Sequence, residues 1–133
     1  MILLALAGAT VVARFPEPSP ADGMVAELLR RPAGESPERT AAALVAASGL
    51  VPWQGRDPAP LLRGGLAVRT RHAADGREIA VFYLPGAADP PVVCRIRRDR
   101  GGASARHYRA VRWCAARLGI TLPAVPPAPV AEN

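Results

Sequence analysis

The stretch from residue 94 to residue 120 combines many arginines with a tryptophan. It holds eight arginines, one aspartate and Trp113. Guanidinium groups neutralise the phosphates of nucleic acids, and an aromatic ring stacks on bases. These residue types therefore indicate a surface that binds nucleic acid without reading its sequence.

The positive charge of the chain is concentrated in its second half. All 17 basic residues are arginine, and the formal net charge is +6. Residues 1–68 carry six arginines and six acidic residues, whereas residues 69–117 carry eleven arginines and four acidic residues. A codon bias toward arginine does not by itself produce this segregation, which favours a functional role for the basic surface. The absence of lysine excludes Schiff-base and P-loop lysine chemistry.

A C-terminal helix is expected to carry part of this surface. Gly101-Gly102 breaks the chain, Ser104 is a suitable N-cap, and Gly119 follows the last apolar position, Leu118. At 100° per residue the predicted core face consists of His107, Val111, Cys114 and Leu118. The predicted outer face carries Arg106, Arg109, Arg112, Trp113 and Arg117.

Three β-rich runs are expected to carry the other arginines. Residues 66–72 and 77–84 flank an Asp75-Gly76 turn, and residues 92–98 alternate in the same way. A two-residue turn would place Arg69 and Arg71 on the face of Phe82. A three-stranded antiparallel meander would add Arg95 and Arg97 to that face.

Nine residues are thus predicted to contact nucleic acid. They are Arg69, Arg71, Arg95, Arg97, Arg106, Arg109, Arg112, Trp113 and Arg117. The competing interpretation is that the C-terminal tail covers Trp113 and that the helical arginines form an ordinary solvated face.

The remaining pattern predicts a single small α+β domain over residues 1–122. Proline and acidic start signals predict two N-terminal helices, at about 20–31 and 37–49, which would form an αα-hairpin. The C-terminal helix would pack on the three-stranded sheet. Residues 123–133 are rich in proline and are predicted to form an extended, partly disordered tail.

The N-terminal segment and the cysteines leave the compartment open. The apolar run within residues 1–15 has the length of a signal-peptide core, but no basic residue precedes it. We therefore expect a cytoplasmic protein without a membrane span. The alternative is an exported, periplasmic protein with a Cys94–Cys114 disulfide that meets the envelope or a protein partner.

The sequence contains no recognisable catalytic motif, so we predict a non-enzymatic protein without a cofactor. Cys94, His107 and Cys114 are the candidates for a metal site, with His72 or a distant acidic residue as the fourth ligand. Cys94 or Cys114 with His107 is the candidate for a Cys-His nucleophile. Core packing explains these residues better. A third functional alternative is an intracellular protein-interaction module or inhibitor that binds an acidic partner.

The stretch LAVRTRHAADGREIAVFYL resembles the wing hairpin of small bacterial winged-helix repressors. The resemblance implies a DNA-binding domain in which the basic hairpin tip contacts the backbone or the minor groove. The chain departs from that pattern in the long loop over residues 50–65, and in the preceding helix, whose only basic residue is Arg39.

Overall fold

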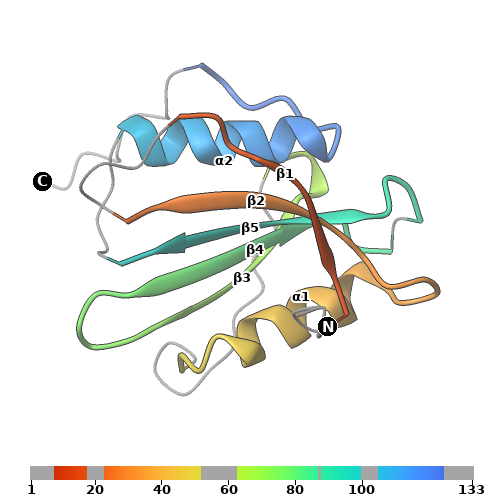
Figure 1. Ribbon diagram of the computed structural model, residues 1–133. Coiled ribbons are helices and arrows are strands. Elements are labelled where there is room, and N and C mark those ends of the chain that lie inside the picture. The colour runs from red at the N-terminus through yellow and green to blue at the C-terminus, as the bar shows by residue number, and fades with distance from the viewer. Residues whose placement is uncertain (1–7, 18–22, 52–62, 87, 100–104, 125–133) are drawn as a thin grey trace, which may run out of the picture.

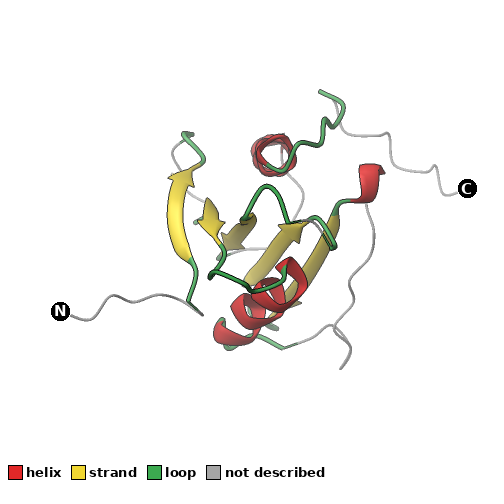
Figure 2. Cartoon of the chain, turned by 90° about the vertical axis from the view of Figure 1, so that its right-hand side faces the viewer, coloured by secondary structure: helices red, strands yellow, loops and turns green. Residues whose placement is uncertain are grey.

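The structure is a computed structural model that describes residues 8–17, 23–51, 63–86, 88–99 and 105–124. In this part of the chain, one antiparallel sheet of five strands lies between two helices, one on each face (Figures 1 and 2). The α+β class is therefore as expected. The predicted three-stranded sheet and N-terminal αα-hairpin are wrong.

The last strand of the sheet in sequence lies at its centre. In chain order the elements are β1 (Thr10–Arg14), β2 (Val25–Arg30), α1 (Pro37–Ala47), a 3-10 turn (Arg63–Gly65), β3 (Ala67–His72), β4 (Glu78–Tyr83), β5 (Val92–Arg98) and α2 (Ala105–Arg117). The spatial order is β1-β2-β5-β4-β3, with every neighbouring pair antiparallel.

The segment predicted as the first helix forms strand β2. Met24 and Leu28 are four residues apart, which suits a helix, but with Ala26 they also fit the two-residue period of a strand. Because β2 has a neighbour on either side and buries both faces, its sequence shows no clean polar alternation. Part of the N-terminal apolar run forms β1, and Ala9 just before it is buried.

The second predicted helix is confirmed as α1. The Ser36 hydroxyl accepts a hydrogen bond from the backbone N–H of Arg39 at 3.2 Å, and Pro37 occupies the first turn. This helix follows a strand rather than another helix, so the helix-turn-helix of a winged-helix domain is missing from the described residues.

The Asp75-Gly76 hairpin is confirmed, but its register differs by one residue from the prediction. His72 pairs with Glu78, and Ala73 donates to the carbonyl of Arg77. The turn therefore contains three residues, 74–76, and ends on Gly76 with φ of 97°. A one-residue shift exchanges the faces of a strand. As a result, Phe82 lies opposite Val68, on the face away from the sheet arginines.

The two helices cover different parts of the sheet. Helix α2 packs on β2 and β5, whereas α1 packs on the other face against β3, β4 and β5. Figure 1 shows the same offset, with α2 beside β2 and α1 beside β3. Each helix therefore covers only part of its face of the sheet.

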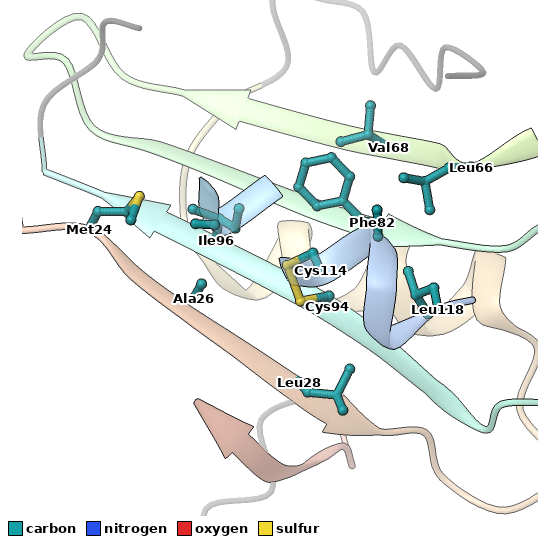
Figure 3. Packing of buried hydrophobic residues seen from close by; sticks show 12 residues of the cluster. Met24, Ala26, Leu28, Leu66, Val68, Phe82, Cys94, Ile96, Cys114 and Leu118 are labelled. Atoms are coloured by element: carbon teal, nitrogen blue, oxygen red, sulfur yellow. A yellow bond between two sulfur atoms is a disulfide. The ribbon is translucent and has the colours of Figure 1, made fainter. Parts of the chain in front are cut away.

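Helix α2 extends close to its predicted bounds but buries a different set of residues. Cys114 and Leu118 are buried as expected, together with Ala110 and Ala115. The other predicted core positions, His107 and Val111, are only half-buried. Cys94 of β5 and Cys114 of α2 form a disulfide at the centre of this core (Figure 3).

The predicted C-terminal tail lies mostly outside the described residues, which end at 124. Leu122 packs against the core on the α2 side of the sheet, and the carbonyl of Pro123 accepts a hydrogen bond from the Tyr108 hydroxyl at 3.0 Å. Among the described residues, no helix has the length and apolar character needed to cross a bilayer.

Candidate anion-binding surface

The predicted nucleic-acid residues fall on opposite faces of the molecule. One group, which we call the helical arginine face, comprises Arg106, Arg109, Arg112, Trp113 and Arg117 of α2. The other group lies on the α1 side of the sheet and comprises Arg69, Arg71, Arg95 and Arg97. A single flat ligand cannot contact both groups at once.

The helical arginine face is largely engaged by the segment after β1. Arg109 makes two hydrogen bonds to the carboxylate of Glu17, at 2.8 and 2.7 Å. Arg106 donates to the backbone carbonyl of Glu17 at 2.6 Å and lies over the ring of Phe15. The hydrogen bond and charge of Arg109 hold the pKa of Glu17 below its usual value. These arginines already have intramolecular partners.

Trp113 is also packed within the protein. Its ring meets Phe15 edge to face with 5.9 Å between centroids, and the guanidinium of Arg117 lies 5.2 Å from the ring centroid. Trp113 is half-buried against the core. Among the described residues, Phe15 and Arg117 thus contact this ring, and the part of the tail beyond residue 124, which the competing interpretation places over it, lies outside them.

On the α1 side of the sheet, three arginines surround one buried carboxylate. Glu27 accepts hydrogen bonds from Arg95 at 2.7 Å, from Arg97 at 3.1 Å and from Arg14 at 3.2 Å. We call these four residues the Glu27 cluster. The side chains of Glu27 and Arg95 are 3% and 4% exposed, whereas those of Arg14 and Arg97 are 71% and 49% exposed.

The strand register brings the cluster together. Arg14, Glu27 and Arg95 are consecutive partners across β1, β2 and β5, and the same row continues through Val81 to Arg69. Residues opposite one another on neighbouring strands share a face. The prediction that Arg69, Arg71, Arg95 and Arg97 share a face is therefore correct, but they surround Val81 and Ile79 rather than Phe82.

Comparison of the chain with family models, curated proteins and solved structures gave no match. The function proposed below therefore rests on geometry alone.

Glu27 remains ionised despite its burial. Burial would raise the pKa of this carboxyl, but the hydrogen bond and charge of Arg95, the charge of Arg97 and the hydrogen bond of Arg14 outweigh it. The pKa of Glu27 therefore lies below its ordinary value of 4.5. One carboxylate thus faces three guanidinium groups, and the Glu27 cluster carries an excess of positive charge.

The surroundings of the cluster are open and partly apolar. Val25 precedes Ala26 and Glu27 on β2, and it pairs with Arg97. Val25 is 38% exposed, and Val11 and Val12 of β1 are 36% and 47% exposed. These exposed arginines and valines lie toward the β1 side of the sheet.

Sequence reasoning missed Arg14 and Glu27. Arg14 follows an apolar run that fits a buried strand or a buried helix, and Glu27 lies in a segment predicted as a helix. No local pattern therefore linked them to Arg95, which is 68 residues from Glu27 in the chain. The useful signal was the single acidic residue in an otherwise apolar segment, residues 24–29, because a buried carboxylate needs a cationic partner.

The residues considered for metal or nucleophilic chemistry have another role. Cys94 and Cys114 are bonded to each other and fully buried, so neither is a thiol. Within the described ranges no group of three or more histidine, cysteine or acidic side chains is placed to hold a metal ion.

Proposed function

We propose that this protein binds nucleic acid non-specifically through the Glu27 cluster and the exposed surface of β1, β2 and β5. The observation that carries the proposal is the sharing of one buried carboxylate by Arg14, Arg95 and Arg97. Phosphate oxygens are strong acceptors for guanidinium groups, which bind them in a bidentate manner.

The structure of the cluster favours a phosphate backbone as the ligand. Arg14 and Arg97 keep much of their side chains in solvent, so a passing phosphate can reach them without unfolding the protein. Glu27 holds the other side of these guanidinium groups and restricts their motion. The exposed valines beside them offer apolar contact to sugars and bases.

The predicted binding site spans helix α2 and the sheet, and the proposal restricts it to the sheet. Arg95 and Arg97 remain in the site, Arg14 is added, and the helical arginine face has a secondary role because Glu17 and Phe15 already occupy Arg106 and Arg109. Binding needs no catalytic group or cofactor under this proposal.

We expect the logarithm of the association constant for a fluorescein-labelled oligonucleotide to fall linearly with the logarithm of salt concentration. In the double variant Arg14→Gln/Arg97→Gln that line is expected to be less steep, with its negative slope smaller in magnitude by about two. Each phosphate contact contributes roughly one unit to the slope. Fluorescence anisotropy at several potassium chloride concentrations measures both affinity and slope.

The matched control is Arg106→Gln/Arg109→Gln, which removes the same charge from α2. Its slope should stay close to that of the unmodified protein, and thermal melting of both variants establishes that they fold. The proposal would be contradicted by absence of binding at low salt, or by a larger change of slope in the α2 variant than in the sheet variant.

The disulfide supports a second candidate, an exported protein that meets the envelope or a protein partner. Buried Cys94 and Cys114 are bonded, and disulfides persist mainly in oxidising compartments. Cleavage of a signal peptide after Ala13 would remove most of β1. An exported protein with this fold would therefore be cleaved at another position or not at all. Labelling of thiols in protein taken directly from its native cells distinguishes the two candidates, because cytosolic protein would be labelled at both cysteines after denaturation.

A further inference from the structure

A cavity of about 330 Å³ adjoins the Glu27 cluster beneath the C-terminal end of α1. It lies between that end of the helix and the hairpin ends of β4 and β5, and we call it the α1 pocket. Arg95 and Arg97 belong both to the cluster and to the lining of the pocket. A group in the pocket would therefore lie directly beside a phosphate bound at the cluster.

One wall of the α1 pocket is the end of α1 with the turn that follows it. Gly49, with φ of 74°, ends the helix. Val51 then pairs with His72 at the end of β3, and the carbonyl of Leu50 accepts a hydrogen bond from Arg71 at 3.5 Å. These contacts hold the turn against the sheet, so the wall is in place before a ligand binds.

The accessible surface of the pocket lies on its walls rather than on its floor. Leu44 and Ile79 are 1% and 3% exposed, so the floor offers a ligand little apolar area. On the helix wall Ala47 is exposed and Leu50 is half-buried. On the sheet wall the side chain of Arg97 is 49% exposed. A flat ring can therefore lie between an aliphatic wall and a guanidinium group.

The charges of the pocket are nearly balanced. Four arginines contribute to its lining, namely Arg77, Arg95, Arg97 and Arg98. Four carboxylates lie in the lining or are paired with these arginines, namely Glu27, Asp75, Glu78 and Asp99. The pocket thus favours an uncharged ring over an acid, and the charged part of a ligand belongs outside it, toward Arg14.

A volume of this size lies at the small end of the range for ligand sites, roughly 300–1,000 Å³, and suits a single ring system. Guanidinium planes stack on unpaired bases in proteins that bind single strands. We propose that the α1 pocket receives one unpaired base of a strand whose phosphates lie on the Glu27 cluster. The inference rests on the proposed nucleic-acid binding and names single strands as the ligand class, because the bases of a duplex are already paired and stacked.

The test compares an oligothymidylate with a strand of the same length made of abasic sites, which keeps the phosphates and removes the bases. By fluorescence anisotropy at one salt concentration, the full chain should bind the oligothymidylate about tenfold more tightly. The salt slopes of the two strands should be equal, because their phosphate contacts are the same. Ala47→Leu narrows the pocket without changing its charge and should make the two affinities equal.

Ala46→Leu is the matched control, because Ala46 is exposed on α1 and does not line the pocket. It should keep the tenfold difference, and thermal melting establishes that both variants fold. The inference is overturned by equal affinities in the unmodified protein, by a difference that persists in folded Ala47→Leu, or by its loss in Ala46→Leu. Those results leave phosphate binding at the Glu27 cluster intact, whereas absence of binding of either strand at low salt overturns both proposals.

Discussion

Replacement of Glu27 by glutamine is expected to lower the free energy of unfolding by roughly 3 kcal/mol, because it leaves the buried Arg95 without its counter-charge. Arg95 is 4% exposed, and its hydrogen bond to Glu27 is 2.7 Å long. Removal of one partner of a buried ion pair is much more destabilising than removal of an exposed one. Chemical denaturation of the two proteins at neutral pH measures the difference.

The same substitution is expected to strengthen nucleic-acid binding. Without the carboxylate, the positive charges of Arg14 and Arg97 are no longer neutralised in part, so their attraction for phosphate increases. A substitution that weakens folding and tightens binding is a signature of a charge cluster shared with a ligand. Anisotropy titrations of folded Glu27→Gln protein test this, and weaker binding would contradict the proposed site.

Glu17→Gln is the matched control. Like Glu27, Glu17 accepts arginine hydrogen bonds, in its case two from Arg109, but it lies in an exposed pair. Its effect on unfolding should be much smaller than that of Glu27→Gln. Similar losses in both variants would show that burial of Glu27 is not the cause.

The contribution of Glu27 should depend on pH in a defined direction. Its pKa is lower in the folded chain than the ordinary value of 4.5, so its stabilisation is complete above that value and is lost as the pH falls through the folded pKa. The stability difference between the unmodified protein and Glu27→Gln should therefore narrow below pH 4.5. A difference that stays constant in acid would mean that the carboxylate charge does not matter.

Reduction of the Cys94–Cys114 disulfide is expected to lower the free energy of unfolding by about 3 kcal/mol, because the bond closes a loop of about twenty residues in the unfolded chain. For a domain of this size the melting temperature should fall by roughly 10 °C. Thermal melts with and without a reductant measure the effect.

The double variant Cys94→Ala/Cys114→Ala is the control for direct effects of the reductant. Its melting temperature should not respond to the reductant, and it should lie at or below that of the reduced protein, since two buried sulfurs are lost as well. Equal stability of oxidised and reduced protein would show that the bond contributes nothing to folding.

Local signals predicted the parts of the fold that local interactions determine. Helix α1 has its N-cap at Ser36, and the hairpin has its turn at Gly76. Strand β2 could not be predicted in this way, because it is specified by pairing with β1 and β5. Over so short a segment, the apolar positions Met24, Ala26 and Leu28 are compatible with both the 3.6-residue period of a helix and the two-residue period of a strand.

The candidate site was predictable only in part, for the same reason. Arg95 and Arg97 were identified because β5 alternates clearly, but Arg14 and Glu27 depend on the correct assignment of β1 and β2. Among the α2 arginines, Arg109 and Arg117 are exposed as expected, whereas Arg106 and Arg112 are half-buried. Phe15 and Glu17 contact Arg106 and Arg109 through tertiary interactions. Helical periodicity cannot predict such contacts.

We propose that the sheet, and not helix α2, provides the nucleic-acid surface. The most direct test is two-dimensional NMR of the isotopically labelled chain during titration with a short oligothymidylate. We expect the largest shifts in β1, β2 and the second half of β5, around Arg14, Glu27 and Arg97. Shifts concentrated on α2 around Arg109 and Trp113, or no shifts at low salt, would contradict it.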